Sequence, residues 1–292
     1  MKANFLIDQH MIEHNEQDIL SILKESYFEV RVGKYIPLAK GDEIPQYFKN
    51  EECVIVYGSM EFVKQQQSKG YVPGAYSQLK NLECVNYISN LDDPSILLND
   101  EHVMITFSEL CRRPNFFFKA LNAEEIFIRP NSGQKIFTGC VLRKDNFDSE
   151  ILSLKQLTSI SHDTLILVSP AQKIKSEYRI AVVNRDVVAA SRYQLNGEIS
   201  LSKYAPLEVI DTARKIAQNT WQPDIAYIVD IAVTDNGSKV LELNAISTSG
   251  LYMMNLPKMF KSWSDAAFSE FSGELSLGDL TGMANIFPKI KF

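Results

Sequence analysis

Short apolar runs alternate with amphipathic patterns along the first third of the chain. Residues 4–7 and 53–57 are apolar runs of strand length, and apolar side chains recur at helical spacing in 16–26 and 60–68. A turn cluster, Asn-Leu-Asp-Asp-Pro, interrupts the pattern at 90–94. The pattern therefore predicts a β-α N-terminal domain over residues 1–98, followed by a second domain over 99–292.

The second part of the chain predicts a mixture of helices and antiparallel hairpins. Helical spacing occupies 101–111, 147–157, 207–218 and 256–271, and strand patterns occupy 126–129, 140–142, 164–168, 177–183 and 187–193. The strand at 164–168 ends at Ser169-Pro170, which indicates an edge strand with free backbone groups. Such a strand is either a plain edge or a place where a purine ring pairs with the backbone.

Three polar side chains interrupt two apolar strands late in the chain. Asp230 lies within 225–233, and Glu242 and Asn244 lie within 239–244. Because side chains alternate along a strand, Glu242 and Asn244 share one face, and Leu241 and Leu243 take the other. Two carboxylates and an amide oxygen are ligands that suit Mg²⁺, whereas the alternative is a solvated hairpin edge with scattered acids.

The turn between these strands decides whether the two carboxylates meet. A three-residue turn with Gly237 in the left-handed conformation places Asp230 opposite Glu242. A two-residue turn at Asn236 and Gly237 places Asp230 on the opposite face of the hairpin. The metal-site hypothesis therefore requires the first turn.

Basic residues in the same part of the chain are candidates for phosphate binding. Arg129 and Lys135 flank a polar loop between two strands, and the backbone amides of such a loop can cradle phosphate oxygens. The alternative is a surface hairpin with solvated cations. Arg179 lies inside the apolar strand 177–183, where a buried cation requires an anionic partner.

Composition limits the partners and the compartment. The 292-residue chain has a formal net charge of −6, so neither nucleic acid nor an anionic membrane is an expected partner. Four isolated cysteines predict reduced core thiols, and there is no apolar run of about 18 residues that would span a membrane. Asp8 introduces a charge too early for a signal peptide. We therefore expect a soluble cytoplasmic protein.

The order of these motifs resembles the ATP-grasp superfamily over about residues 100 to 260. The stretches Arg129-Pro130, Lys135-Ile136-Phe137-Thr138-Gly139, Glu177-Tyr178-Arg179 and Glu242-Leu243-Asn244 are similar to a clade of ATP-grasp proteins common in bacteriophages and bacteria. The resemblance implies an α+β ATP-grasp fold with a small β-α N-terminal domain, a lid at about 115–165 and a C-terminal antiparallel sheet. Many family members carry Lys-Pro in place of Arg129-Pro130, which changes the donor geometry toward phosphate.

The resemblance also implies roles for single residues. Arg129 and Lys135 would hold the phosphates of ATP, and the backbone of Leu167 and Val168 would pair with adenine. Arg179 would contact the transferred γ-phosphate or the acyl phosphate, so that Arg179 and Lys135 are the candidate catalytic residues. Asp230, Glu242 and Asn244 would hold magnesium.

The segment after the metal hairpin is a candidate acceptor site. Residues 247–252 follow Asn244 so closely that they must stay near the metal, at most about 3.3 to 3.6 Å per residue away. We expect Ser249, Gly250 and Tyr252 to contact the substrate, with Arg192 as a counter-charge for a carboxylate. The alternative is a plain connector between strand and helix.

The implied activity is an ATP- and magnesium-dependent ligase. It would join a small-molecule or peptide carboxylate to an amine, forming an amide bond through an acyl phosphate intermediate. The alternatives are an ATP-grasp kinase that phosphorylates a hydroxyl, a nucleotide-binding module without turnover, and an interaction protein that binds no ATP. The sequence predicts neither the substrates nor the oligomeric state.

Overall fold

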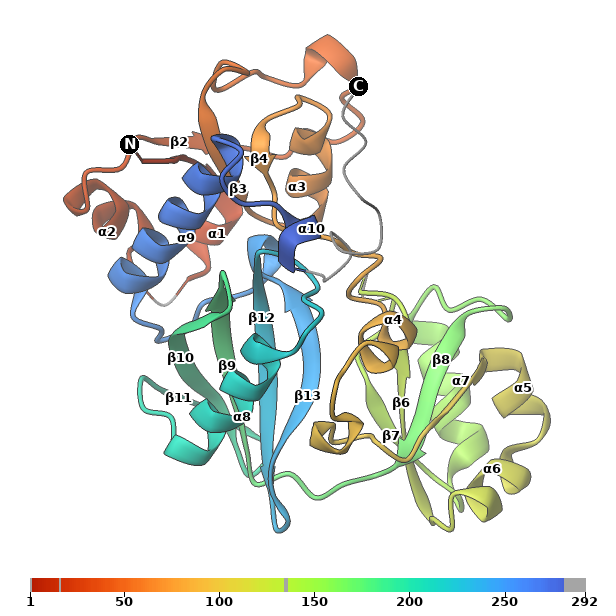
Figure 1. Ribbon diagram of the computed structural model, residues 1–292. Helices are drawn as coiled ribbons and strands as arrows, with labels where there is room; N and C mark the ends of the chain where they lie inside the picture. The colour runs from red at the N-terminus through yellow and green to blue at the C-terminus, as the bar shows by residue number, and fades with distance from the viewer. Residues whose placement is uncertain (1, 16, 134–135, 281–292) are drawn as a thin grey trace, which may run out of the picture.

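The computed structural model describes residues 2–15, 17–133 and 136–280 of the chain, which form three sheets with helices packed against them (Figure 1). One sheet is parallel and N-terminal, one is a five-stranded antiparallel sheet, and one is a four-stranded antiparallel sheet beside it. None of the described helices is long and apolar enough to cross a lipid bilayer.

The N-terminal sheet has the strand order β2-β1-β3-β4. Its strands are β1 (Asn4–Asp8), β2 (Val30–Gly33), β3 (Cys53–Tyr57) and β4 (Val72–Gly74), and its helices are α1 (Gln9–Glu13), α2 (Ile19–Glu25), α3 (Met60–Gln67) and the 3₁₀ turn η1 (Gly41–Glu43). The strands predicted at 4–7 and 53–57 are confirmed as β1 and β3. The apolar stretch before the turn cluster at 90–94 forms helix α4 (Cys84–Ser89), and η2 (Pro94–Ile96) follows.

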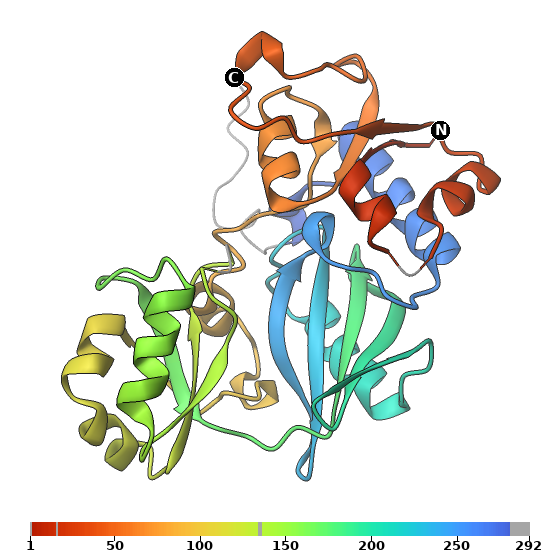
Figure 2. The same cartoon turned by 180° about the vertical axis from the view of Figure 1, so that it is seen from behind.

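The long helix α9 (Leu256–Phe271) completes the N-terminal core from the far end of the sequence. The ring of Phe5 in β1 lies edge-on to those of Phe260 and Trp263, at centroid distances of 5.3 and 6.2 Å. From behind, α9 is seen beside α1 and α2 (Figure 2). The helix predicted at 256–271 is therefore confirmed, and it ties the N-terminal sheet to the rest of the chain. A short helix, α10 (Leu277–Leu280), follows it.

The four-stranded sheet has the order β5-β8-β6-β7. Its elements are β5 (Val103–Thr106), α5 (Phe107–Arg112), α6 (Pro114–Ala120), β6 (Glu125–Pro130), β7 (Cys140–Arg143), α7 (Phe147–Leu157) and β8 (Leu165–Pro170). This sheet contains the predicted lid at about 115–165 but extends beyond it at both ends. The domain boundary near residue 98 stays a prediction.

Two predictions about this sheet are wrong. The helix expected over 101–111 begins only at Phe107, because the preceding Val-Met-Ile-Thr run pairs with β8. The strand β8 is interior rather than an edge: Leu167 is paired with Met104 on one side and with Arg129 on the other. The backbone of Leu167 and Val168 is therefore taken up by ladder pairing, and only β6 pairs with Ser169 and Pro170.

The five-stranded sheet has the order β11-β10-β9-β12-β13. Its strands are β9 (Ser176–Val183), β10 (Asp186–Leu195), β11 (Glu198–Ser202), β12 (Ala226–Thr234) and β13 (Gly237–Ala245), and helix α8 (Leu207–Gln218) covers one face. On the other face, Ala181 and Ile228 pack into the N-terminal core. Arg179 lies two residues from Ala181 on β9, and Asp230 lies two residues from Ile228 on β12, so both share this face of the sheet. They lie where the apolar contacts with the N-terminal core end.

The hairpin of β12 and β13 reaches the expected pairing by an unexpected turn. Thr234 pairs with Gly237 across the turn, so neither turn considered from the sequence is formed. An irregularity after Asp230 then shifts the register by one residue, which leaves Asp230 opposite Glu242. Gly237 does adopt a positive φ of 93°. The prediction that the two carboxylates face each other is confirmed, but the reason given for it is wrong.

A buried carboxyl group next to β12 gives the stability a defined pH dependence. Asp224 is 5% exposed and accepts hydrogen bonds from the backbone amides of Ile225 and Gln78. Burial raises its pKa to about 8, although these hydrogen bonds act in the opposite direction. A carboxyl whose pKa is raised by folding contributes stability that is complete below its unfolded pKa of about 4 and is lost as the pH rises through 8.

We therefore expect the Asp224→Asn variant to lose this pH dependence, because an amide does not titrate in this range and its single oxygen can still accept one of the two backbone hydrogen bonds. Urea unfolding between pH 4 and 9 should show the wild type losing stability relative to the variant as the pH rises. Parallel pH profiles for the two proteins would show that folding does not shift the pKa of Asp224.

Candidate active site

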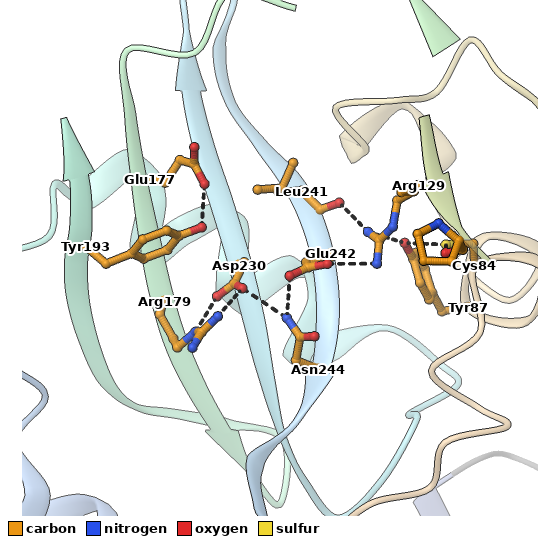
Figure 3. Close-up of polar contacts among 11 residues, drawn as sticks. Cys84, Tyr87, Arg129, Glu177, Arg179, Tyr193, Asp230, Leu241, Glu242 and Asn244 are labelled. Atoms are coloured by element: carbon orange, nitrogen blue, oxygen red, sulfur yellow. Dashed lines mark hydrogen bonds and ion pairs between the residues drawn. The ribbon is translucent and has the colours of Figure 1, made fainter. Parts of the chain in front are cut away.

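A buried ion pair forms the centre of the polar face. Both oxygens of Asp230 in β12 accept hydrogen bonds from Arg179 in β9: Nε donates to Oδ1 at 2.9 Å and Nη2 to Oδ2 at 2.7 Å (Figure 3). The Asp230 side chain is 1% exposed and that of Arg179 is 9% exposed. The strand register causes this contact, because Asp230 is paired with Arg179 on one side and Glu242 on the other. The anionic partner predicted for Arg179 is therefore Asp230.

A second ion pair joins the two antiparallel sheets. Nη2 of Arg129, at the end of β6, lies 2.7 Å from Oε2 of Glu242 in β13. Nη1 of Arg129 donates to the carbonyl oxygen of Leu241 at 3.4 Å and to the hydroxyl of Tyr87 at 3.5 Å. Burial alone would lower the pKa of Arg129, but Tyr87 and Glu242 raise it above its ordinary range. Arg129 therefore remains a cation in a protected position.

Asn244 connects the two ion pairs. Its amide nitrogen donates to Oδ2 of Asp230 at 3.0 Å and to Oε1 of Glu242 at 2.8 Å. Two carboxylates, one amide and two guanidinium groups thus form one continuous network across β6, β9, β12 and β13 (Figure 3). The charges within the network balance, which allows four charged groups to be largely buried.

This donor set fits a divalent cation. The two carboxylates and the amide point toward one place, and a half-turn of the Asn244 amide would present its oxygen there. No group of three or more acidic, histidine or cysteine side chains with metal-binding geometry exists in the described part of the chain, so the amide is needed for a third ligand. In this structure the two arginines neutralise the two carboxylates. A bound cation and its phosphates would rearrange these contacts.

An aromatic pair packs against Arg179. The rings of Tyr193 and Tyr252 are stacked, with centroids 5.4 Å apart, and Cζ of Arg179 lies 5.5 and 5.1 Å from the two centroids. Nη1 of Arg179 donates to the carbonyl oxygen of Gly250 at 3.3 Å. Burial would lower the pKa of Arg179, but Asp230 raises it well above its usual range. Gly250 and Tyr252 thus lie beside Arg179, and their contact with a substrate stays a prediction.

The other candidate acceptor residues lie differently. The hydroxyl of Ser249 donates to the carbonyl of Ala245, and its own carbonyl accepts from Tyr57 of the N-terminal sheet, so Ser249 supports the segment from within. The guanidinium of Arg192 donates to Ser200 in β11 through Nε and Nη2. The expectation that Arg192 faces the site is wrong, because Arg192 is paired with Tyr178 and its neighbour Ser191 with Arg179, so that Arg192 points to the opposite face of the sheet from Arg179.

The side chains of this network line a cavity of about 440 Å³. Phe127, Ile174 and Leu241 provide apolar walls, while Ser132, Gly133 and Thr138 line it from the loop between β6 and β7. Leu241 was expected on the opposite face from Glu242, but the shifted register brings both into the same lining. Lys135 belongs to this loop and lies outside the described residues, so its role as a phosphate ligand stays a prediction.

Glu177 and Tyr193 are among the cavity residues to which the sequence analysis assigned no role. Tyr193 donates a hydrogen bond to Glu177 at 2.5 Å, and both line the cavity. Burial raises the pKa of Glu177, although the hydrogen bond from Tyr193 acts in the opposite direction. Strand alternation could have identified Glu177, which shares a face with Arg179 two residues later. No local signal identifies Tyr193, because the register shift in β10 determines where it points.

A sequence comparison then decides the family. Residues 112–261 match the family described as ATP-grasp domain, R2K clade family 2. This chain is a member of that ATP-grasp family. The matched range includes the candidate ligands on β6, β9, β12 and β13, and the predicted resemblance to the ATP-grasp superfamily is confirmed. No curated protein matches the sequence.

Solved structures of ATP-grasp proteins share the fold over almost the whole chain. D-cycloserine synthetase DcsG is 10% identical with a TM-score of 0.58, and the match covers 91% of this chain and 99% of that one. D-alanine–D-alanine ligase from Bacillus anthracis is 11% identical with a TM-score of 0.58, covering 94% and 100%. ATP-grasp ligase PsnB, in complex with a minimal precursor, Mg and ADP, is 13% identical with a TM-score of 0.52, covering 92% and 98%. At these identities the likeness confirms the predicted ATP-grasp fold.

Proposed function

We propose that ATP binds in the 440 Å³ cavity between the two antiparallel sheets. The observation that carries this proposal is the network of Arg129, Glu242, Asn244, Asp230 and Arg179, which brings guanidinium, carboxylate and amide groups together in the lining of that cavity. The apolar walls formed by Phe127, Ile174 and Leu241 suit the adenine ring. The phosphates would then extend toward the loop between β6 and β7 and toward the two arginines.

Adenine recognition by the backbone requires a revised position. The backbone of Leu167 and Val168 is paired within the sheet, so these residues cannot offer free groups along β8. Ile174 lines the cavity from the segment that connects β8 to β9. We therefore place the backbone contact with adenine in residues 169–174.

The proposed reaction is ligation of a carboxylate to an amine. A carboxylate oxygen of the acceptor attacks the γ-phosphorus, the bond to the β-phosphate oxygen breaks, and ADP leaves with an acyl phosphate remaining. The amine then attacks the acyl carbon, inorganic phosphate leaves with the bridging oxygen, and the amine loses a proton. Mg²⁺, when bound, neutralises charge on the phosphate oxygens. Arg179 and Arg129 hold and orient the transferred group.

The acceptor would lie beside Gly250 and Tyr252. These residues already flank Arg179, which donates to the Gly250 carbonyl. One of these proteins is named as a ligase of D-alanine with D-alanine, and PsnB is an ATP-grasp ligase whose structure was solved with a precursor peptide. An amino acid or peptide carboxylate is the corresponding acceptor class for this chain. The same nucleotide site could serve a kinase, so the product must distinguish the two reactions.

Oxygen-isotope transfer tests the proposal. The protein is incubated with Mg-ATP and a panel of amino acids, dipeptides and polyamines, and ADP release identifies the active acceptor and amine. With an ¹⁸O-labelled carboxylate, we expect one ¹⁸O atom in each phosphate released, because the acyl phosphate passes its bridging oxygen to phosphate. Phosphorylation of a hydroxyl acceptor, with no label in phosphate, would show a kinase and contradict the ligase assignment.

A further inference from the structure

A second cavity, of about 660 Å³, lies apart from the nucleotide cavity. It is lined by residues of β10, of α8, of the segment after β11 and of the stretch 253–258, which leads into α9. Its apolar lining includes Val187, Ala190, Ile210 and Met254. The two cavities share no lining residue, so this one is not an extension of the proposed ATP site.

The charged lining of this cavity is entirely basic. Lys203, Arg214 and Lys258 line it, and no acidic residue does so among the described parts of the chain. Arg214 forms an ion pair with Asp211 at 2.7 Å. Lys203 lies over the ring of Tyr204 at 5.5 Å, and neither it nor Lys258 forms an ion pair with a described residue. In a chain with a net charge of −6, this concentration of positive charge favours an anionic ligand.

An edge strand leads directly to the cavity. β11 is the outermost strand of its sheet, and its last residue, Ser202, is followed by the lining residues Lys203 and Tyr204 (Figure 1). Ile199 on this strand is 86% exposed. An edge strand presents unpaired backbone groups that can pair with an extended peptide. The backbone edge, the apolar lining and the cations are the three features that a bound acidic peptide uses.

We propose that this surface binds an acidic peptide segment in extended conformation, with its backbone along β11 and its acidic and apolar side chains at the cavity. The wall of the cavity also reaches the candidate active site, because Met253 and Met254 directly follow Tyr252. A docked peptide would therefore contact the segment that covers Arg179. Peptide docking does not depend on the proposed ligase activity and is measurable without turnover.

Fluorescence anisotropy with labelled peptides tests the proposal. The probe is a pool of fluorescein-labelled octapeptides in which Glu alternates with Val, Leu or Phe, and the control pool has Lys in place of Glu. We expect saturable binding of the acidic pool alone, weakened by salt, and at least about tenfold weaker binding by the Lys203→Glu/Lys258→Glu variant. The matched control is Lys261→Glu, which alters an exposed lysine of α9 that pairs with Asp265 and does not line the cavity.

Three results would overturn the proposal. One is the absence of acidic-peptide binding up to about 1 mM. Another is an equal loss of peptide affinity in the Lys203→Glu/Lys258→Glu variant and in the Lys261→Glu control. The third is tighter, competitive binding of a fluorescein-labelled oligothymidine, which would assign the surface to nucleic acid. Thermal unfolding of each variant verifies that it remains folded, so that loss of binding reports on the surface.

Discussion

Replacing Asp230 by Asn is expected to lower the free energy of unfolding by about 3–5 kcal/mol, because it leaves a buried guanidinium without its anionic partner. Asp230 is 1% exposed and both of its oxygens bind Arg179. The substitution preserves the shape of the side chain but removes the charge, and an amide nitrogen would face an N–H donor of Arg179. Urea unfolding without nucleotide measures the effect directly.

The matched control is Asp235→Asn, on the turn of the same hairpin. Asp235 also forms an ion pair, with Lys175, but its side chain is 69% exposed and that of Lys175 is 48% exposed. Solvent screens such a pair, so the unfolding midpoint should remain close to the wild-type value. If Asp230→Asn and Asp235→Asn were equally stable, the Arg179–Asp230 pair would not be a buried charge pair that the fold requires.

Local patterns predicted most of the elements around the site. The helices at 147–157, 207–218 and 256–271 and the strand at 53–57 have the predicted bounds, because their apolar spacing agrees with the faces that they bury. Strand alternation also predicted that Glu242 and Asn244 share a face, whereas the placement of Asp230 opposite Glu242 was predicted only for a turn that does not form. These features depend on neighbours within one helix or one hairpin.

The failed predictions depend on contacts between distant segments. The pairing of β5 with β8 converted part of a predicted helix into a strand and made β8 interior. Register shifts after Asp230 in the β12–β13 pair and after Arg192 in β10 determined that Leu241 and Tyr193 line the cavity. A bulge reverses the facing of the residues after it, and sequence alternation alone does not reveal where it occurs.

The second large effect is expected at Glu242. Glu242 is proposed as a magnesium ligand, and its side chain is 21% exposed at the wall of the cavity. Loss of its charge by the Glu242→Gln substitution should weaken the binding of Mg-ATP by at least about 100-fold. Arg129 keeps its contacts with the Leu241 carbonyl and the Tyr87 hydroxyl, so the fold should survive. Glu125→Gln is the matched control, because Glu125 pairs with Arg143 on the surface of β6.

Calorimetric titration with ATP, with and without Mg²⁺, tests most directly whether the cavity between the two antiparallel sheets is a magnesium-nucleotide site. The wild type and the Glu125→Gln variant should each bind one ATP in the presence of Mg²⁺, and their affinity for ATP should fall strongly when EDTA removes the metal. The Glu242→Gln variant should lose the increase in ATP affinity that Mg²⁺ provides. Equal affinity of all three proteins for ATP, with or without the metal, would contradict the proposed site.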